Sequence, residues 1–334
     1  WLKTIVYILY QYGNTMEKPE SVPKVAVSAC LLGQNVRYNG GHCNFALFDR
    51  LNDFIEKVSF CPEVGIGLGT PRPTIRLVDS PLGIRLVEPK SGKDYTQKMA
   101  EWSELQSDSL INQKISGIVF KKGSPSCGLE RIKVYSENNH PQKNGTGLFS
   151  MIFTTLYPHI PAIEEGRLNE PIQAENFLAR VAMMDLWWKY EDRGWTIFSL
   201  QQFHSEHKLL LQSRSPKSTR ILGNLLAVNP ENKSIGELAL EYITMAQEYM
   251  GHNVEKRYVA AALRRAVGRL PKDLPKSQRA YLHTWIDYYL KGLVPRIASM
   301  ALIQQAYEMT GSESLPWKHL FEPFNVVSGV MAKV

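Results

Sequence analysis

Hydrophobic residues follow different patterns in the two halves of this 334-residue chain. In the first half, short apolar runs alternate with clusters of glycine, serine and proline, a pattern typical of buried strands joined by loops. Three of these runs, at 25–30, 58–61 and 115–120, lead to Cys30, Cys61 and Cys127. In the second half, apolar residues recur at helical spacing. The helices predicted there cover residues 172–191, 200–212, 218–228, 235–250, 254–269, 277–290 and 295–310.

These patterns predict an α/β fold, in which a domain with a Rossmann-like, mostly parallel sheet is followed by an all-α helical domain. Residues 45–55 carry apolar side chains at helical spacing and predict a crossover helix after the first strand. Residues 75–88 alternate around a turn and predict a hairpin. A further helix is expected at 148–156, and a long one from its N-cap Asp94 to Lys114. The candidates for the buried face of the long helix are Met99, Trp102, Leu105, Leu110 and Ile111.

A cluster of prolines between residues 157 and 171 marks the expected boundary between the two domains. We expect an α/β domain at 16–160 and a helical domain at 161–334. Residues 1–15 are expected to be a non-native or disordered extension, because Met16 begins a polar stretch that leads into the first strand.

The composition is that of an ordinary globular protein, with 44% hydrophobic and 21% charged residues, which excludes a disordered chain. The apolar part of residues 1–15 is too short to span a bilayer, and no signal peptide is visible, so we expect no membrane association. The cysteines are then expected to be free thiols in a reducing, cytoplasmic setting. The net charge of +7 is compatible with a polyanionic partner but does not require one.

Three cysteines at the carboxyl ends of parallel strands should meet at one edge of the sheet, where open α/β sheets bind their ligands. Three interpretations are open at this point. The cysteines are buried apolar side chains, or they bind zinc with His42 or Cys43 as a fourth ligand, or they hold an iron–sulfur cluster from three sides. Their spacing alone does not separate zinc from a cluster.

The loops around these cysteines carry motifs that resemble, in order, those of the thiouracil desulfidase family. The likeness extends over residues 25–157. The motifs are Ser-Ala-Cys-Leu-Leu-Gly at 28–33, Val-Arg-Tyr-Asn-Gly-Gly at 36–41, Cys-Pro-Glu-Val at 61–64, Thr-Pro-Arg at 70–72, Ser-Pro-Ser-Cys-Gly at 124–128 and Gly-Thr-Gly at 145–147. Cys43 lies outside them, and we interpret it as a spectator.

The resemblance implies a 4Fe-4S cluster held by Cys30, Cys61 and Cys127, with one iron open to the sulfur of a thiolated pyrimidine. Polarisation of the carbon–sulfur bond would then let water replace the sulfur. Glu63 is the candidate for proton transfer and Ser126 the candidate for orienting substrate or water. Their alternatives are a carboxylate at a helix N-terminus and a turn hydroxyl. The candidate substrate contacts in this half are Ser28, Arg37, Tyr38, Arg72, Arg76, Lys122 and Ser124.

The second half resembles the helical domain that follows this module in bacterial tRNA 4-thiouridine desulfidases. The matching text is Glu-Gly-Arg-Leu-Asn at 165–169, Glu-Asn-Phe at 175–177 and Phe-His-Ser-Glu-His-Lys at 203–208. Residues 256–279 are strongly basic and could neutralise several phosphates, or they form an ordinary solvated helix face. The candidate RNA contacts are Arg264, Arg265 and Arg269. His204 and His207 are expected to be structural or RNA-contacting.

The leading hypothesis is therefore an iron–sulfur desulfidase that removes sulfur from 4-thiouridine in tRNA. The fused helical domain favours tRNA over a small substrate. One alternative is a desulfidase of free thiouracil or thiouridine nucleotides. The other is a non-enzymatic, zinc-stabilised RNA-binding protein.

Overall fold

The computed structural model describes residues 22–81, 83–136, 138–229, 232–272, 274–310 and 320. Packing divides these residues into two compact units, one that ends at Phe177 and one that begins at Leu178. The expected extension at residues 1–15 lies outside the described residues, as does almost all of the stretch from 311 to the end.

The first unit is built on a four-stranded sheet in which all neighbouring strands are parallel, which confirms the predicted fold class. Its order is β2-β1-β5-β8. Strand β1 is almost fully buried, as its run of small and β-branched side chains predicts for a central parallel strand. Strand β8 was not predicted; it is only three residues long and extends the sheet beyond β5. The strands are β1 (Lys24–Ser28), β2 (Glu56–Phe60), β5 (Gly117–Phe120) and β8 (Ala162–Glu164).

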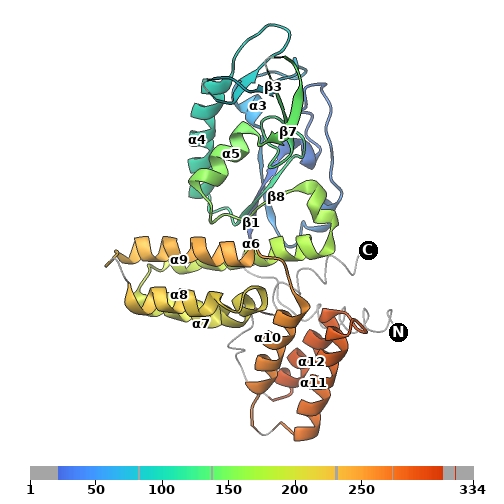
Figure 1. Cartoon of the computed structure of the whole chain (residues 1–334), viewed down its shortest axis with the longest axis vertical. Helices are drawn as coiled ribbons and strands as arrows, with labels where there is room; N and C mark the ends of the chain where they lie inside the picture. The colour runs from blue at the N-terminus through green and yellow to red at the C-terminus, as the bar shows by residue number, and fades with distance from the viewer. Residues whose placement is uncertain are drawn as a thin grey trace. The chain divides into compact units, whose positions relative to one another are not determined.

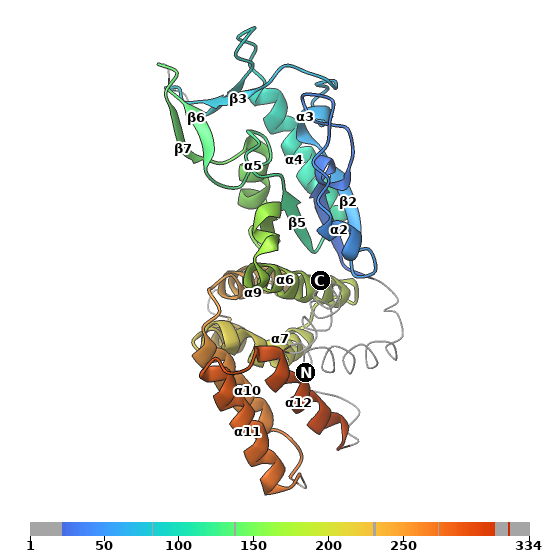
Figure 2. The same ribbon diagram turned by 90° about the vertical axis from the view of Figure 1, so that its right-hand side faces the viewer.

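A second, smaller sheet lies apart from the first in the same unit (Figure 2). Its order is β4-β3-β6-β7. The antiparallel pairing of β3 with β4 confirms the predicted hairpin, while β3 and β6 run parallel. The strands are β3 (Arg76–Val78), β4 (Arg85–Val87), β6 (Ile132–Tyr135) and β7 (Pro141–Gly145).

The predicted crossover helix at 45–55 is wrong in length, because only α2 (Leu47–Arg50) is helical there. The backbone N–H groups of Leu51 and Ile55 instead close successive turns onto the carbonyls of Leu47 and Leu51. The polar pair Asn52-Asp53 favours such turns, because its side chains compete for backbone hydrogen bonds.

Helix α4 (Thr96–Asn112) begins one residue later than predicted, with Tyr95 rather than Asp94 at the N-cap. The Asp94 carboxylate still accepts the Thr96 N–H at 2.8 Å, so it satisfies a first-turn donor. Leu105, expected on the buried face, is 72% exposed. Two serines occupy that face instead, because their hydroxyls bond to carbonyls four residues earlier in the helix and need no water.

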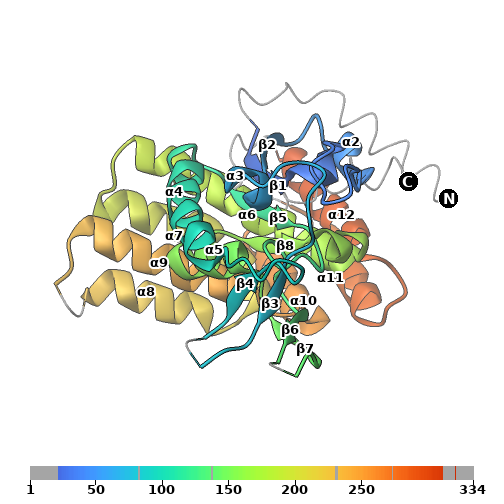
Figure 3. The same cartoon turned by 90° about the horizontal axis from the view of Figure 1, so that it is seen from above.

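Helices α4 and α5 (Leu148–Leu156) pack against each other on one side of the first sheet, and α2 lies on the other (Figure 3). An aromatic cluster joins this layer to the sheet. The Phe149 ring of α5 lies 5.1 Å from Phe60 and 6.0 Å from Phe120, measured between centroids. Phe60 and Phe120 are the last residues of β2 and β5, so this core supports the strand ends that lead to the cysteines.

The second unit is helical, as predicted, with boundaries within a few residues of those expected (Figure 1). Within it, α10, α11 and α12 stand at a steep angle to α7, α8 and α9. Capping boxes begin α7 and α9. No helix in the described residues is both long and apolar enough to span a membrane. The helices are α6 (Pro171–Asp192, which crosses the unit boundary), α7 (Ile197–Arg214), α8 (Ser218–Val228), α9 (Ile235–Met250), α10 (Lys256–Gly268), α11 (Lys276–Leu290) and α12 (Arg296–Glu308).

His204 belongs to the core of the helical unit. Its Nδ1 lies 3.1 Å from the hydroxyl of Tyr242, a fully buried residue. Burial, with a smaller contribution from the positive charge of Lys208, lowers the pKa of His204 to about 4. The folded protein therefore holds this imidazole neutral at pH values where an unfolded chain would protonate it.

We predict that His204 makes stability fall with pH. Between pH 6.5 and 5 the unfolded chain binds a proton here that the folded chain does not, so the free energy of unfolding should drop. The drop relative to His204→Gln should be about 1 to 2 kcal/mol. Urea unfolding of both proteins at each pH measures it, and parallel pH profiles would contradict the prediction.

Candidate active site

The three predicted cysteines lie just beyond the carboxyl ends of the parallel strands. Cys30 is in the short 3-10 helix after β1, and Cys61 is the N-cap of the short helix α3 (Pro62–Gly65) after β2. Ser28 is level with Phe60 in the β1–β2 register, so these two strands end together. All the cysteines are free thiols; Cys30 and Cys127 are buried and Cys61 is partly buried.

The thiols are close enough to influence one another electrostatically. Burial raises the pKa of Cys30 to about 11, and the neighbouring Cys43 and Cys61 raise it further. Burial also raises the pKa of Cys127, with added repulsion from Cys61, Glu63 and Cys30. The pKa of Cys61 is raised as well, again chiefly by burial. Ionising these thiols together is therefore costly unless a cation accompanies them.

The loop that carries Cys127 is held by its own serine. The Ser124 hydroxyl oxygen accepts the backbone N–H groups of Ser126 at 3.3 Å and Cys127 at 3.2 Å. The first amides of α5 close the loop from the other side, since Phe149 N–H donates to the Ser126 carbonyl at 3.0 Å. The Cys127 position is therefore fixed by backbone bonds rather than by packing alone.

Gly147 allows this close approach of α5 to the loop. A Cβ atom at position 147 would lie 2.6 Å from the carbonyl carbon of Ser126 and 2.8 Å from the backbone nitrogen of Cys127. Backbone atoms cannot yield as a flexible side chain can, so only glycine fits here without moving the loop.

Glu63 and Ser126, the two predicted catalytic residues, are in contact. The Ser126 hydroxyl donates to Oε1 of Glu63 at 2.8 Å. The other carboxylate oxygen, Oε2, accepts Nε of Arg72 at 2.8 Å and forms an ion pair with Nη2 at 2.7 Å. The side chains of Arg72 and Glu63 are only 5% and 14% exposed. The carboxylate is thus held between a hydroxyl and a guanidinium.

Arg72 also anchors the glycine-rich loop between β1 and α2. Its Nη2 donates to the carbonyl of Val36 at 2.8 Å, and its backbone N–H donates to the carbonyl of Tyr38 at 2.8 Å. Nη1 reaches the carbonyl of Gly69 at 3.1 Å. Although predicted as a substrate contact, Arg72 uses its guanidinium to join protein segments.

Three other predicted substrate contacts lie near the cysteines. Ser28 is buried; its hydroxyl accepts the Lys121 N–H at 3.1 Å and reaches the Cys127 thiol. Arg37 is close enough to Cys30 to lower its pKa slightly. The Arg37 guanidinium lies 5.6 Å from the ring centroid of Tyr38, which is 44% exposed.

Arg76 and Lys122 have other surroundings. Arg76 starts β3 in the second sheet, where Nη2 donates to Asn139 Oδ1 at 2.7 Å and the guanidinium stacks on the Tyr135 ring. Lys122 is exposed, and its backbone N–H donates to Glu165 Oε2 at 2.7 Å. Neither observation links these two side chains to the thiols.

Sequence reasoning missed Lys121, Glu165 and the place of Cys43. Lys121 is ion-paired with Glu165, a buried residue, and its charge lowers the pKa of Cys30 slightly. Cys43, expected to be a spectator, donates its backbone N–H to the Cys30 carbonyl at 2.8 Å and lies beside that thiol. The position of Lys121 directly after β5 was a usable signal, but its partner 44 residues later was not.

The predicted RNA contacts lie in the helical unit. Arg264 and Arg265 lie on the exposed side of α10, and Arg269 directly follows that helix and is also exposed. Arg264 is ion-paired with Asp287, and Arg265 donates to Gln212. His207, by contrast, is 1% exposed, and its Nδ1 bonds to the carbonyl of Phe203, so its role is structural.

We predict that Gly147→Ala exposes Cys127. The new methyl group must push the loop outward, so the unfolding free energy should fall by about 1 to 3 kcal/mol. Alkylation of Cys127, measured by peptide mass spectrometry, should become faster than in wild type. Gly69→Ala is the control, because a Cβ there meets nothing within 4 Å. Equal Cys127 alkylation rates in the two variants would contradict the prediction.

We predict that Arg72→Met is strongly destabilising. It leaves the Glu63 carboxylate buried without its counter-charge, which should cost about 3 to 5 kcal/mol of unfolding free energy. The exposed pair Arg85–Asp94 provides a control, since Arg85→Met should cost under about 1 kcal/mol. Urea unfolding measures both, and adding Glu63→Gln to Arg72→Met should recover stability. A similar cost for the two arginines would show that burial of the ion pair is unimportant.

Comparison with known proteins follows the same division of the chain. Residues 25–165 match the family described as 2-thiouracil desulfurase, and residues 208–325 match the one described as protein of unknown function (DUF1722). The protein YbbK of Bacillus subtilis (strain 168) is 31% identical over 109 residues, which are 31% of this chain and 72% of that protein.

Among solved structures, the [4Fe-4S]-dependent thiouracil desulfidase TudS is 33% identical, with a TM-score of 0.35. That match covers 44% of this chain and 94% of the other. The family match at 25–165 contains all the cysteines, Glu63, Arg72 and Ser126. The chain therefore belongs to the 2-thiouracil desulfurase family.

Proposed function

We propose that this protein is an iron–sulfur-dependent desulfidase that converts 4-thiouridine in tRNA to uridine and sulfide. The observation that carries the proposal is the group of free, largely buried cysteines beside the Ser126–Glu63 hydrogen bond. Membership of the 2-thiouracil desulfurase family supports a thiolated pyrimidine as substrate.

The thiols of Cys30, Cys61 and Cys127 suit a 4Fe-4S cluster by the chemistry of the donor set. Iron–sulfur clusters are bound by cysteine thiolates, each on its own iron. In the described residues no three His, Cys, Asp or Glu side chains are arranged to hold a metal ion. When bound through three cysteines, the cluster would supply one open iron as a Lewis acid for the substrate sulfur.

The chain's own polar groups supply the proton transfer. Glu63 Oε1, which accepts the Ser126 hydroxyl at 2.8 Å, is placed to take a proton from a water molecule that Ser126 orients. The water oxygen replaces sulfur on the ring carbon, so one C–O bond forms, one C–S bond breaks, and sulfide leaves. Arg72 keeps the carboxylate in place through its two contacts to Oε2.

Arg37 and Tyr38 are the best placed of the candidate substrate contacts. Tyr38 exposes its ring, on which a pyrimidine can stack. Arg37, whose charge reaches Cys30, can pair with an oxygen of the substrate. Ser28, Ser124 and Arg72 use their polar atoms within the protein, so we assign them to positioning.

The helical unit supports tRNA as the carrier of the thiolated base. Arg264, Arg265 and Arg269 are exposed, and the partners of Arg264 and Arg265 are surface groups from which phosphates can displace them. A free thiopyrimidine is the second candidate, because the α/β unit alone contains the cysteines, Glu63 and Ser126.

We predict that anaerobically reconstituted protein removes 4-thiouridine from tRNA, as measured by nucleoside mass spectrometry. Cys127→Ala should lose the cluster absorbance and all activity. Ser126→Ala and Glu63→Gln should keep the absorbance and lose about 100- to 10,000-fold in rate. Wild-type rates in these two variants would remove them from the mechanism, and no sulfur loss with a complete cluster would refute the proposal.

The substrate is tested by changing Arg264, Arg265 and Arg269 together to Ser. This triple variant should bind tRNA more weakly, with a slope of log K against log salt reduced by about 2 to 3. Turnover of 4-thiouridine nucleoside should stay at the wild-type rate, which makes it the internal control. If tRNA turnover in moderate salt is unchanged, these arginines do not bind tRNA.

A further inference from the structure

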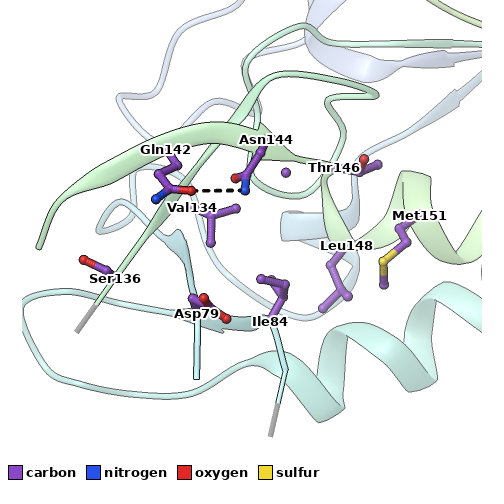
Figure 4. Close-up of a pocket in the computed structure, with 10 residues that line it drawn as sticks. Asp79, Ile84, Val134, Ser136, Gln142, Asn144, Thr146, Leu148 and Met151 are labelled. Carbon is purple, nitrogen blue, oxygen red and sulfur yellow. Dashed lines mark hydrogen bonds between the residues drawn. The ribbon is translucent and has the colours of Figure 1, made fainter. Parts of the chain in front are cut away.

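A cavity of about 300 Å³ lies between the second sheet and the start of α5, on residues that the proposed reaction does not use (Figure 4). It is of a size for one small heterocycle. Strands β6 and β7 form one wall and the first turns of α5 another. The lining residues are Asp79, Ile84, Val134, Ser136, Gln142, Asn144, Gly145, Thr146, Leu148 and Met151.

The apolar part of the cavity is available to a flat ring. Val134 and Leu148 are buried beneath it, whereas Ile84 is 38% and Met151 42% exposed. Water-exposed side chains of this size gain when an aromatic face covers them, at roughly 25 cal/mol per Å² of apolar surface buried. Methionine also makes favourable contacts with aromatic rings.

The polar part consists mainly of amides on one face of β7. Gln142 and Asn144 are two residues apart, and Asn144 Nδ2 lies 3.4 Å from Gln142 Oε1. At that length the bond is weak, so a ligand can replace it at little cost. An Asn or Gln amide pairs with adenine through two bonds, donating to N7 and accepting from the 6-amino group.

The charge of the lining selects against phosphate and for an amino group. Asp79 is the only charged residue that lines the cavity, and none is a lysine, arginine or histidine. A carboxylate accepts hydrogen bonds from an exocyclic amino group but repels an anion. Uracil has no such amino group, so the cavity does not match the product of the proposed reaction.

The walls are rigid and adjoin the cysteine loop. A Cβ on Gly145 would lie 2.4 Å from Cγ2 of Val134, so β7 is seated tightly on β6. Thr146 donates its hydroxyl to the Leu129 carbonyl at 3.1 Å, and the next residue, Gly147, packs on the backbone of Ser126. The cavity is therefore preformed on the segment that also supports Cys127.

We propose that this cavity is a binding site for adenine, held by the Asn144 or Gln142 amide and by Asp79, with its ring against Ile84 and Met151. The adenine is either that of a free nucleoside or a base within RNA. The site is separate from the proposed desulfidase chemistry, and neither depends on the other.

Adenosine is the first probe, titrated into the full-length protein and followed by ligand-observed NMR, with uridine as the competing base. We expect adenosine to bind at least tenfold more tightly than uridine, and Asn144→Leu to remove that preference. Met151→Trp, which fills the cavity, should abolish binding. Asn112→Leu, an exposed amide at the end of α4 outside the cavity, is the matched control and should bind as wild type.

A second arm separates the two sources of adenine. A five-nucleotide RNA with one central adenosine is compared with its all-uridine counterpart on wild type and Asn144→Leu. An Asn144-dependent preference exceeding that for adenosine indicates a base in RNA, and a smaller one indicates a free nucleoside. No adenosine binding, or equal binding in wild type and Asn144→Leu, overturns the proposal. Because sulfur release is not measured, this failure leaves the desulfidase proposal untouched.

Discussion

The buried ion pair between Glu63 and Arg72 is the interaction on which the geometry of the site depends. Arg72 contacts Glu63 in the turn after β2, the carbonyl of Val36 in the glycine-rich loop, and Gly69 in its own loop. A guanidinium can do this because its donors form a rigid, planar fork. Since a buried carboxylate is stable only when paired, the loops cannot separate without exposing or stranding a charge. The pair therefore fixes Glu63 against Ser126 and the glycine-rich loop against both.

Much of this site could be predicted from the sequence, because its main determinants are local. Strands are visible as β-branched runs, the ends of parallel strands share one edge, and Cys30 and Cys61 directly follow two such ends. Glu63 and Ser126 were placed in the site only through a resemblance, since they are 63 residues apart. The ion pair between Glu63 and Arg72 was not predicted; Arg72 was assigned to substrate. Sequence shows that an arginine is present but not which charge it will meet.

The wrong predictions share a physical cause, which is that tertiary contacts override local pattern. The apolar residues at 45–55 have helical spacing, yet the chain turns twice there and α2 is one turn long. Leu105 was expected inside α4, but Ser103 and Ser107 are buried because each satisfies its hydroxyl on the helix backbone. Strand β8 has three residues, too few for any periodicity, and exists because β5 offers it an edge. The long amphipathic helices of the second unit, by contrast, were predicted almost to the residue.

The electrostatics of the cysteine group explain why the site needs positive charge from several sources. Burial disfavours each thiolate, and the thiolates and Glu63 disfavour one another. Lys121 and Arg37 offset part of this at Cys30, and Arg72 does so at Cys61. These cations lie on three different loops, so the loops must close for the thiolates to be tolerated. A cationic cluster core bound to the cysteines would supply the remaining charge, and its binding would draw the same loops together. Cluster binding and ordering of the site should therefore be a single event rather than two.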